Sequence, residues 1–293
     1  MIKHNIRNIL LIITLASLLL LGVSLPVLAA DPTTEVHVVK YASDGTTVVN
    51  ETTVDYRWME ANLPVQGDGI THYYHQGPIF NESKDKWDPE ETENFKDKGA
   101  VRGTDIADLC KLVGGMLETD TAVLSAPDGY SLEFDYENVY QPQDRQGPIV
   151  LCWYSVEDGT QGQQQEAGYP PRYFEAMQIV FMAKTTSPDG KYVFGNWDMH
   201  ECLPEMSVHF YSDGSQLYPS TNGLSLKWCD QIAIYPQDAP GEAKERTVDI
   251  STPSTDDESS SGSSSLSLII GVSIAAAVLV LLSAVTVARR RRS

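Results

Sequence analysis

Two histidines lie three residues apart in the segment THYYHQGPIF, residues 71–80, of a chain that has six histidines in all. On a β-strand His72 and His75 point to opposite faces, so they share one site only if a turn or bulge brings them together. The sequence Gln76-Gly77-Pro78 that follows is suited to such a turn. The spacing of the two histidines is by itself weak evidence for a metal site.

A second group of metal-ligand types occurs in the segment GNWDMHECLPE, which contains Asp198 and His200. Imidazole and carboxylate groups bind divalent transition metals. If the two segments meet in the fold, His72, His75, Asp198 and His200 form a metal or ligand site. The alternative is that the histidines and aromatic residues hydrogen-bond within a polar core, and we prefer this alternative.

Aromatic residues around both segments give a third interpretation. Rings with few charges nearby suit sugar or heterocyclic ligands, although the same residues commonly fill protein cores. The residues concerned are Tyr73, Tyr74, Trp87, Trp153, Tyr169, Tyr173 and Trp197. Residue type alone does not separate a binding cleft from a core.

Other catalytic motifs do not occur in the sequence. It contains no G-x-S-x-G nucleophile elbow, no H-E-x-x-H motif, no glycine-rich phosphate loop and no Walker lysine. The adjacent acids Glu90 and Glu91 lie in the polar run WDPEETENFKDKG, which is typical of a solvated loop rather than of a glycosidase acid pair. Nucleophilic and glycosidase catalysis are therefore not indicated.

The four cysteines, Cys110, Cys152, Cys202 and Cys229, are far apart and form no C-x-x-C pair, which argues against a zinc ribbon or a redox motif. In an exported protein disulfides are the default, and four cysteines allow three pairings. Cys152 and Cys229 lie in strand-like segments where a small apolar residue would serve. We therefore predict a Cys110–Cys202 disulfide and two buried thiols.

The first 30 residues are typical of a secretory signal. Lys3 and Arg7 precede the apolar run ILLIITLASLLLLGV, and the small residues of VLAA suit cleavage near Ala29 or Ala30. The alternative is an uncleaved anchor helix. Either way, the chain from Asp31 onward is predicted to be exported.

A second apolar segment, Leu266–Ala288, carries no charge, and about 23 helical residues span roughly 34 Å, enough to cross a bilayer. Because arginines follow directly, the positive-inside rule places the tail, residues 289–293, in the cytoplasm. Residues 241–265 are rich in serine and acidic residues and predict a flexible stalk. The expected protein is a single-pass cell-membrane protein with one large extracellular domain, residues 31–240. The C-terminal pattern also resembles sorting tails that some prokaryotic surface proteins lose during processing.

The charge of the chain agrees with a surface location. There are 21 Lys and Arg against 40 Asp and Glu, and six of the basic residues lie in the signal and the tail. The exported part therefore keeps 15 basic residues and a net charge near −25, which argues against a nucleic-acid partner. Two sequons, at Asn50 and Asn81, are potential N-glycosylation sites.

The exported domain is predicted to be mostly β-structure with a few short helices. Period-2 apolar patterns separated by Gly, Pro, Asp and Asn predict short strands. A helix is expected in GTDIADLCKLVGG, with Thr104 as its N-cap and Gly114 at its end. A second is expected in TTVDYRWMEANLP, capped by Thr52 or Thr53 and ended by Pro64. The predicted strands are TEVHVVKY, GITHYYHQGPIF, TAVLSA, YSLEFDY, PIVLCWY, MQIVFMA, KYVFGNW and LSLKWCDQIAIY.

Two short motifs carry a resemblance to a known family. DGYS at Asp128–Ser131 and LKWCDQI at Leu226–Ile232 are similar to a hairpin and to the closing strand of the molybdopterin-binding domain of the sulfite oxidase family. A helix ending in LPV, the strand THYYHQGPIF and a glycine-ended helix also follow in the family's order. The resemblance covers most of the domain and implies an α+β, mostly β fold of this type.

The resemblance also implies a cofactor site, from which this chain departs. In those enzymes the strand in the place of THYYHQGPIF presents a cysteine thiolate to molybdenum, and basic residues hold the pterin phosphate. No cysteine occurs between residues 31 and 101, so molybdenum cannot be held in the family's manner. A pterin would have to be held by His72, His75, Arg102 and Arg145.

Two functions follow from these observations. The first is a membrane-anchored cell-surface module that binds a small molecule or a cell-envelope ligand and has no cofactor. The second is an extracytoplasmic oxidoreductase that binds molybdopterin or a divalent metal near His72, His75, Asp198 and His200. The missing thiolate favours the first.

Overall fold

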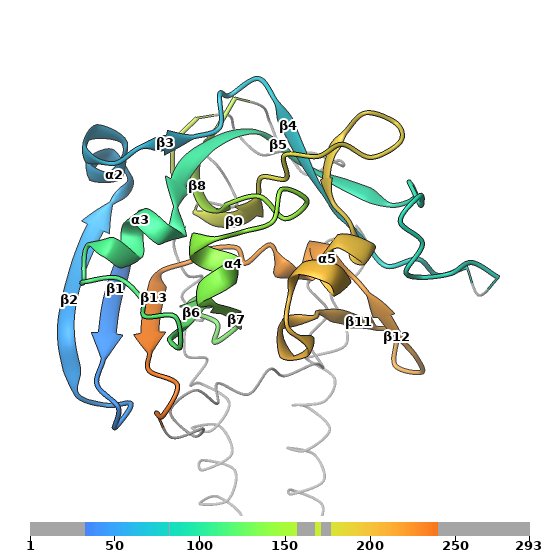
Figure 1. The fold of residues 1–293 in the computed structure, drawn as a ribbon. Coiled ribbons are helices and arrows are strands. Elements are labelled where there is room, and N and C mark those ends of the chain that lie inside the picture. The colour runs from blue at the N-terminus through green and yellow to red at the C-terminus, as the bar shows by residue number, and fades with distance from the viewer. Residues whose placement is uncertain (1–32, 82, 157–167, 171–176, 240–293) are drawn as a thin grey trace, which may run out of the picture. The chain divides into compact units, whose positions relative to one another are not determined.

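The computed structural model describes residues 33–239, apart from residues 82, 157–167 and 171–176. Within these ranges strands predominate and the helices are short (Figure 1), which confirms the predicted mostly β class. The chain divides into two compact units, Met1–Thr252 and Pro253–Ser293, and every described residue belongs to the first.

The segments predicted at the two ends of the chain lie outside the described residues. They are the signal (1–30), the stalk (241–265), the membrane span (266–288) and the tail (289–293). Among the helices of residues 33–239 that are described, none is both long and apolar enough to span a membrane.

The first sheet has five strands in the order β2-β1-β13-β6-β7. β1 and β13 are parallel, whereas the other neighbouring pairs are antiparallel. The parallel pair joins the first described strand to the last, so both ends of the described region are held in one sheet. The strands are β1 (Glu35–Tyr41), β2 (Val48–Asp55), β6 (Thr121–Ser125), β7 (Ser131–Asp135) and β13 (Gln231–Tyr235).

The second sheet is built around one long strand, β5 (Phe95–Asp105). The first half of β5 pairs with β4 and its second half with β8, and the register shifts between Arg102 and Gly103. The strand order is β10-β4-β5-β8-β9, with β3 also on β5. The other strands are β3 (Val65–Gln66), β4 (His72–Gln76), β8 (Ile149–Ser155), β9 (Gln178–Phe181) and β10 (Tyr192–Phe194).

A separate two-stranded ribbon and short helices complete the described fold. The ribbon consists of β11 (Phe210–Ser212) and β12 (Leu217–Pro219). The α-helices are α2 (Tyr56–Asn62), α3 (Ile106–Lys111), α4 (Tyr136–Tyr140) and α5 (Asn196–Cys202), and the 3₁₀ helices are η1 (Glu205–Ser207) and η2 (Thr221–Leu224).

Alternation along the strands produces the main core. In β8, Ile149, Leu151 and Trp153 belong to the main apolar cluster, whereas Val150 and Cys152 belong to a smaller cluster on the other face. This is the period-2 pattern of a sheet covered on both sides. Trp153 is fully buried and donates its indole N–H to Thr104 Oγ1 at 3.0 Å. This buried N–H therefore has a hydrogen-bond acceptor within the core.

Both predicted helices occur, but each begins at a different residue from the one expected. Asp55 caps α2 by accepting from the Trp58 N–H, and Asp105 caps α3 by accepting from the Ala107 N–H. Thr104, predicted as a cap, points its hydroxyl at Trp153 instead. An aspartate directly before each helix outcompetes the neighbouring threonine, because a carboxylate is the stronger acceptor.

The predicted strand LSLKWCDQIAIY is shorter than expected. Only Gln231–Tyr235 forms β13, and the preceding residues include the end of η2 and Trp228 in a left-handed conformation with φ of 56°. The segment KYVFGNW is likewise divided between β10 and the start of α5. In the first segment the left-handed Trp228 interrupts the pattern, and in the second the extended Gly195 serves as the N-cap of the helix that follows.

Candidate functional site

His75 lies in β4 and is fully buried. Its Nε2 accepts a hydrogen bond from the backbone N–H of Phe181 at 3.1 Å, and its Nδ1 is 2.7 Å from Ser225 Oγ. Because Nε2 is the acceptor, the ring proton is on Nδ1 and is donated to the serine oxygen. Burial, with the nearby Lys98 charge as a second cause, holds the pKa of His75 well below its ordinary value. The neutral ring therefore has no free lone pair for a metal or for a substrate proton.

His72 has a different environment on the same strand. Its Nδ1 lies 2.9 Å from Asp97 Oδ2, and the side chain is partly exposed. The register of β4 against β5 shifts between His72 and Tyr74. This shift does not unite the two histidines, since one pairs with Asp97 on β5 and the other lies in the core.

Asp198 and His200 both lie on α5 but have separate contacts. Asp198 accepts from the Gly195 N–H at 3.0 Å and pairs with Arg145 at 3.3 Å, while burial raises its pKa. His200 is exposed and lies 3.2 Å from Glu201 Oε1. Residues two apart on a helix do not face each other. Among the described residues, no group of three or more His, Cys, Asp or Glu side chains is placed to hold a metal.

The two arginines proposed for a pterin phosphate also have local partners. The Arg102 guanidinium lies 4.1 Å from the centre of the Tyr154 ring and 4.0 Å from Glu60 Oε1. Arg145 pairs with Asp198. The residues present therefore do not fit the family's cofactor, because the thiolate is missing and both cations are engaged elsewhere.

All four cysteines are free thiols, so the predicted Cys110–Cys202 disulfide is not formed in the structure. Cys110 faces the core from α3, near Asp105, and burial raises its pKa to about 12. Cys202 ends α5 near Asp198, and burial likewise raises its pKa to about 12. A disulfide needs Cβ atoms about 3.5–4.5 Å apart, and these two thiols have different neighbours. Cys152 and Cys229 are buried thiols, as predicted.

A buried polar network connects β4 to α5 through Gln76. The Gln76 Oε1 accepts from the backbone N–H of Asn196 at 2.8 Å, and the Asn196 Oδ1 accepts from the Thr221 N–H at 3.0 Å. The Gln76 Nε2 donates to the carbonyls of Glu91 at 3.5 Å and Glu93 at 3.3 Å. One buried amide therefore holds both the start of α5 and the loop before β5.

These two supported segments and strand β11 bring four rings together, which we call the tryptophan cluster: Trp87, Trp197, His200 and Phe210. Trp197 and His200, three residues apart on α5, stack with ring centres 5.5 Å apart. Trp87 lies 5.1 Å from His200 and 6.1 Å from Phe210, edge to face with the latter. His200 and Phe210 are exposed and the two indoles are partly buried, so the cluster lies at the surface.

The same loop also contacts the ribbon next to the cluster. Phe80 is 53 % exposed and meets the ring of Tyr218 edge to face at 5.1 Å, and the Lys86 ammonium lies 4.3 Å from the same ring. Tyr211 lies opposite Tyr218 in the ribbon, while Phe210 is the neighbouring strand residue. Successive strand residues point to opposite faces, so the loop contacts the ribbon on both faces.

The polar groups around the tryptophan cluster are suited to a neutral ligand with hydroxyl groups. Glu201, whose Oε1 lies 3.2 Å from the His200 ring, supplies a carboxylate acceptor at the cluster. Flat apolar faces with a few polar groups at the rim suit a sugar, which offers C–H faces and hydroxyls together. The arrangement can bind a ligand, and its side chains include no nucleophile activated by a neighbouring base.

Sequence reasoning found part of this cluster. Trp87 and Trp197 were among the candidate cleft residues, and His200 was selected as a metal ligand rather than as a ring. Phe210 was missed, although the i, i+3 spacing of Trp197 and His200 could have indicated an aromatic helix face. Of the other candidates, Trp153 is buried in the core, Tyr73 and Tyr74 are partly buried on β4, and Tyr173 lies outside the described residues.

Comparison with known proteins identifies no relative. No protein-family model matches the chain, and the searches of curated proteins and of solved structures found no match either.

Proposed function

We propose that the chain is a cell-surface binding module, exported by its N-terminal signal and held to the membrane by the helix Leu266–Ala288. Its ligand is a soluble or cell-envelope carbohydrate, bound against the tryptophan cluster. The domain belongs in this proposal to the sulfite oxidase type of α+β fold, on the sequence resemblance carried by DGYS and LKWCDQI.

One observation carries the carbohydrate proposal. Trp87, Trp197 and Phe210 come from three separate parts of the chain, yet they gather at the surface around His200. Apolar rings gain about 25 cal/mol per Å² of area removed from water, so a fold without a ligand would favour burying them. A cluster left at the surface and supported by a buried amide is typical of a binding site.

The oxidoreductase alternative has no specific observation in its favour. His75 has both ring nitrogens engaged, and Arg102 and Arg145 pair with Glu60 and Asp198. The other residues on which that hypothesis depends, His72 and His200, lie beside Asp97 and Glu201. We therefore derive no reaction step through a pterin or a metal.

Calorimetric titration of the purified full chain with a panel of soluble oligosaccharides tests the ligand class. For a sugar that binds, Trp87→Ala and Trp197→Ala should each weaken the affinity by about tenfold, because loss of a ring contact worth about 1 kcal/mol is added to lost buried area. Trp58→Ala is the matched control, since Trp58 is 40 % exposed on α2 and has no part in the cluster. Binding by none of the sugars, or equal loss in the control, contradicts the proposal.

Protease treatment of intact cells tests the location separately. Residues 31–265 should be digested while the membrane span and the Arg tail are protected. A chain that stays intact until the cells are lysed would contradict export, whatever the outcome of the sugar titration.

A further inference from the structure

We infer that Asn81, and not Asn50, is the residue of the folded domain that accepts an N-linked glycan. The inference rests on the proposed export, because glycan transfer takes place on the exported side of a membrane. Both residues begin an Asn-x-Ser/Thr sequon and both are exposed. Their local structures differ, and this difference decides which of the two asparagines the folded domain presents for glycan transfer.

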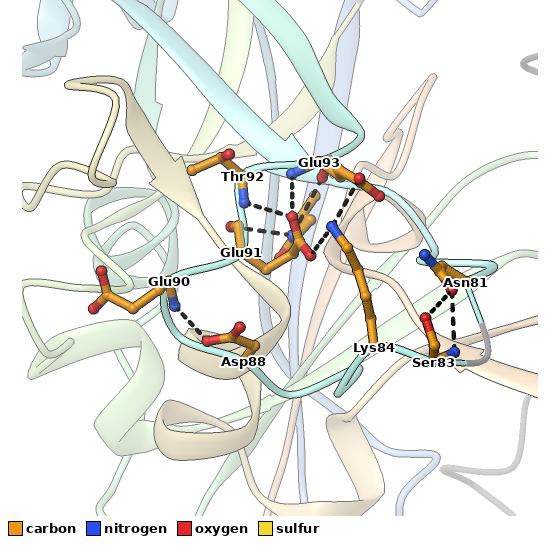
Figure 2. Close-up of polar contacts among 9 residues, drawn as sticks. Asn81, Ser83, Lys84, Asp88, Glu90, Glu91, Thr92 and Glu93 are labelled. Atoms are coloured by element: carbon orange, nitrogen blue, oxygen red, sulfur yellow. Dashed lines mark hydrogen bonds and ion pairs between the residues drawn. The ribbon is translucent and has the colours of Figure 1, made fainter.

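Asn81 is in a turn that presents its side chain (Figure 2). Its Oδ1 accepts two hydrogen bonds from the third residue of the sequon, one from the Ser83 N–H at 3.0 Å and one from the Ser83 hydroxyl at 2.7 Å. The hydroxyl that defines the sequon is thus already aimed at the acceptor carboxamide. Asn81 is exposed, and in the part of the chain that the structure describes no group accepts a hydrogen bond from its Nδ2.

The base of this turn is fixed to the rest of the loop. The Lys84 N–H donates to the Asn81 carbonyl at 3.1 Å, and the Lys84 Nζ lies 2.7 Å from carboxylate oxygens of both Glu91 and Glu93 (Figure 2). These bonds raise the pKa of Lys84, and the hydrogen bond from Lys84 lowers the pKa of Glu91. The backbone carbonyls of Glu91 and Glu93 are in turn bound by the buried Gln76. The sequon therefore projects from an anchored loop and needs no unfolding to be reached.

Asn50 lies in the edge strand β2, next to the point where the register of the β1–β2 ladder shifts. It is opposite Lys40 in the antiparallel ladder between β2 and β1, and Glu51 and Thr52 continue the same pairing. An extended, paired backbone separates the Asn50 carboxamide from the Thr52 hydroxyl, because residues i and i+2 on a strand are nearly 7 Å apart along it. For the two to meet, the strand must first leave the ladder locally.

The transfer itself needs one co-reactant, an oligosaccharide linked to a lipid through a pyrophosphate, and a membrane-bound transferase. The Asn81 Nδ2 attacks the anomeric carbon of the first sugar, and the new N–C bond forms as the C–O bond to the pyrophosphate breaks. The lipid pyrophosphate leaves with the electron pair of that bond. The proton from Nδ2 passes to a carboxylate of the transferase.

Transfer to the folded protein tests the inference. The full chain, made without glycans and purified in detergent, is incubated with a purified transferase and its lipid-linked oligosaccharide, and peptide masses give the occupancy of both sites over time. Asn81 should be modified at least about tenfold faster than Asn50. Asn50 reacts only in molecules whose edge strand is locally open, and these are on the order of one tenth of the population or fewer. In two synthetic peptides that carry the sequons, where no ladder exists, the rates should come within a few-fold of each other.

Variants and cell fractionation separate this inference from the proposed function. Asn81→Gln should abolish transfer to the folded chain, Ser83→Thr should retain it, and Asn50→Gln should leave it unchanged. Equal rates at the two sites, or faster transfer to Asn50, overturns the inference. In a glycosylating host, a chain that protease reaches on intact cells but that carries no glycan at Asn81 overturns this inference alone, whereas a chain retained inside overturns the proposed function as well.

Discussion

Two regions, the polar network around β4 and the tryptophan cluster, are each assembled from distant parts of the chain. They differ in the contacts that their side chains make. In the network, His75 and Gln76 are buried and hydrogen-bond to Phe181, Ser225 and Asn196. In the cluster the rings contact one another at the surface, and Trp87 also packs against the main core. The histidines of the two regions show that environment, rather than residue type, decides whether a side chain supports the fold or can meet a ligand.

The two regions are also connected. Gln76 holds the carbonyls of Glu91 and Glu93 with its amide nitrogen and the first N–H of α5 with its amide oxygen. The first contact positions the loop that carries Trp87, and the second positions the helix that carries Trp197. The segment THYYHQGPIF is therefore best understood as the support of the candidate site rather than as the site.

Replacing Gln76 with glutamate should have the largest effect. The variant keeps the shape but places a carboxylate against two carbonyl oxygens, and an uncompensated buried charge costs about 3–5 kcal/mol. Denaturant unfolding of the full chain, followed by tryptophan fluorescence, should show a loss of that size. The matched control is Gln141→Glu, an exposed position after α4, which should change the unfolding free energy by less than about 0.5 kcal/mol. Equal effects would mean that the network does not support the fold.

The pH dependence of stability should distinguish His75 and His209 from the exposed His200. Burial lowers the pKa of His75 and of His209 in the folded state, so the unfolded chain binds more protons below about pH 6.5. Stability is then fully present above that pH and falls as the pH decreases, by up to about 1.4 kcal/mol per pH unit for each histidine.

Unfolding free energies measured from pH 7.5 to 5 check this sign with two variants. His75→Leu should reduce the slope and leave the part due to His209. His200→Gln, which removes an exposed ring, should leave the slope unchanged. An unchanged slope in His75→Leu together with a reduced slope in His200→Gln would reverse the comparison of the two regions.

Removing a ring from the tryptophan cluster should affect stability much less than it affects binding. Trp197→Ala removes a large side chain, but one that is already partly exposed, and surface substitutions usually stay near 0.5 kcal/mol. We expect the free energy of unfolding to fall by about 1 kcal/mol or less in the same measurement. A loss of about 3–5 kcal/mol, the range for a buried tryptophan, would show that the cluster is an extension of the core.

The ion pairs of Lys84 should contribute least. The Lys84 side chain lies near solvent, where ion pairs contribute little to stability. Lys84→Met should therefore lower the unfolding free energy less than Trp197→Ala does, and raising the salt concentration should reduce the difference between variant and wild type. A larger, salt-independent loss would indicate that Lys84 holds the loop by packing instead.

The sequence predicted local features better than long-range ones. The helices Tyr56–Asn62 and Ile106–Lys111 follow from apolar spacing and nearby capping residues, and most strands follow from alternation. The caps were assigned to threonines because residue type alone does not show which side chain is free; Thr104 is engaged by Trp153, 49 residues away.

The candidate site could be predicted only in part for the same reason. The partners of His75 lie 106 and 150 residues further along the chain, so its burial and its tautomer depend on contacts that no local pattern contains. The meeting of Trp87 with Phe210 depends on how the loop passes the ribbon. The sequence shows which aromatic residues are available, but tertiary packing decides which of them meet at the surface.

The most direct test of the central claim is fluorine NMR of the full chain labelled with 5-fluorotryptophan, which gives one signal for each of its five tryptophans. During titration with an oligosaccharide that binds in the calorimeter, the signals of Trp87 and Trp197 should shift, while those of Trp58 and the buried Trp153 stay in place. Movement of the Trp58 signal alone, or of no signal during binding, would contradict the assignment of the ligand to the tryptophan cluster.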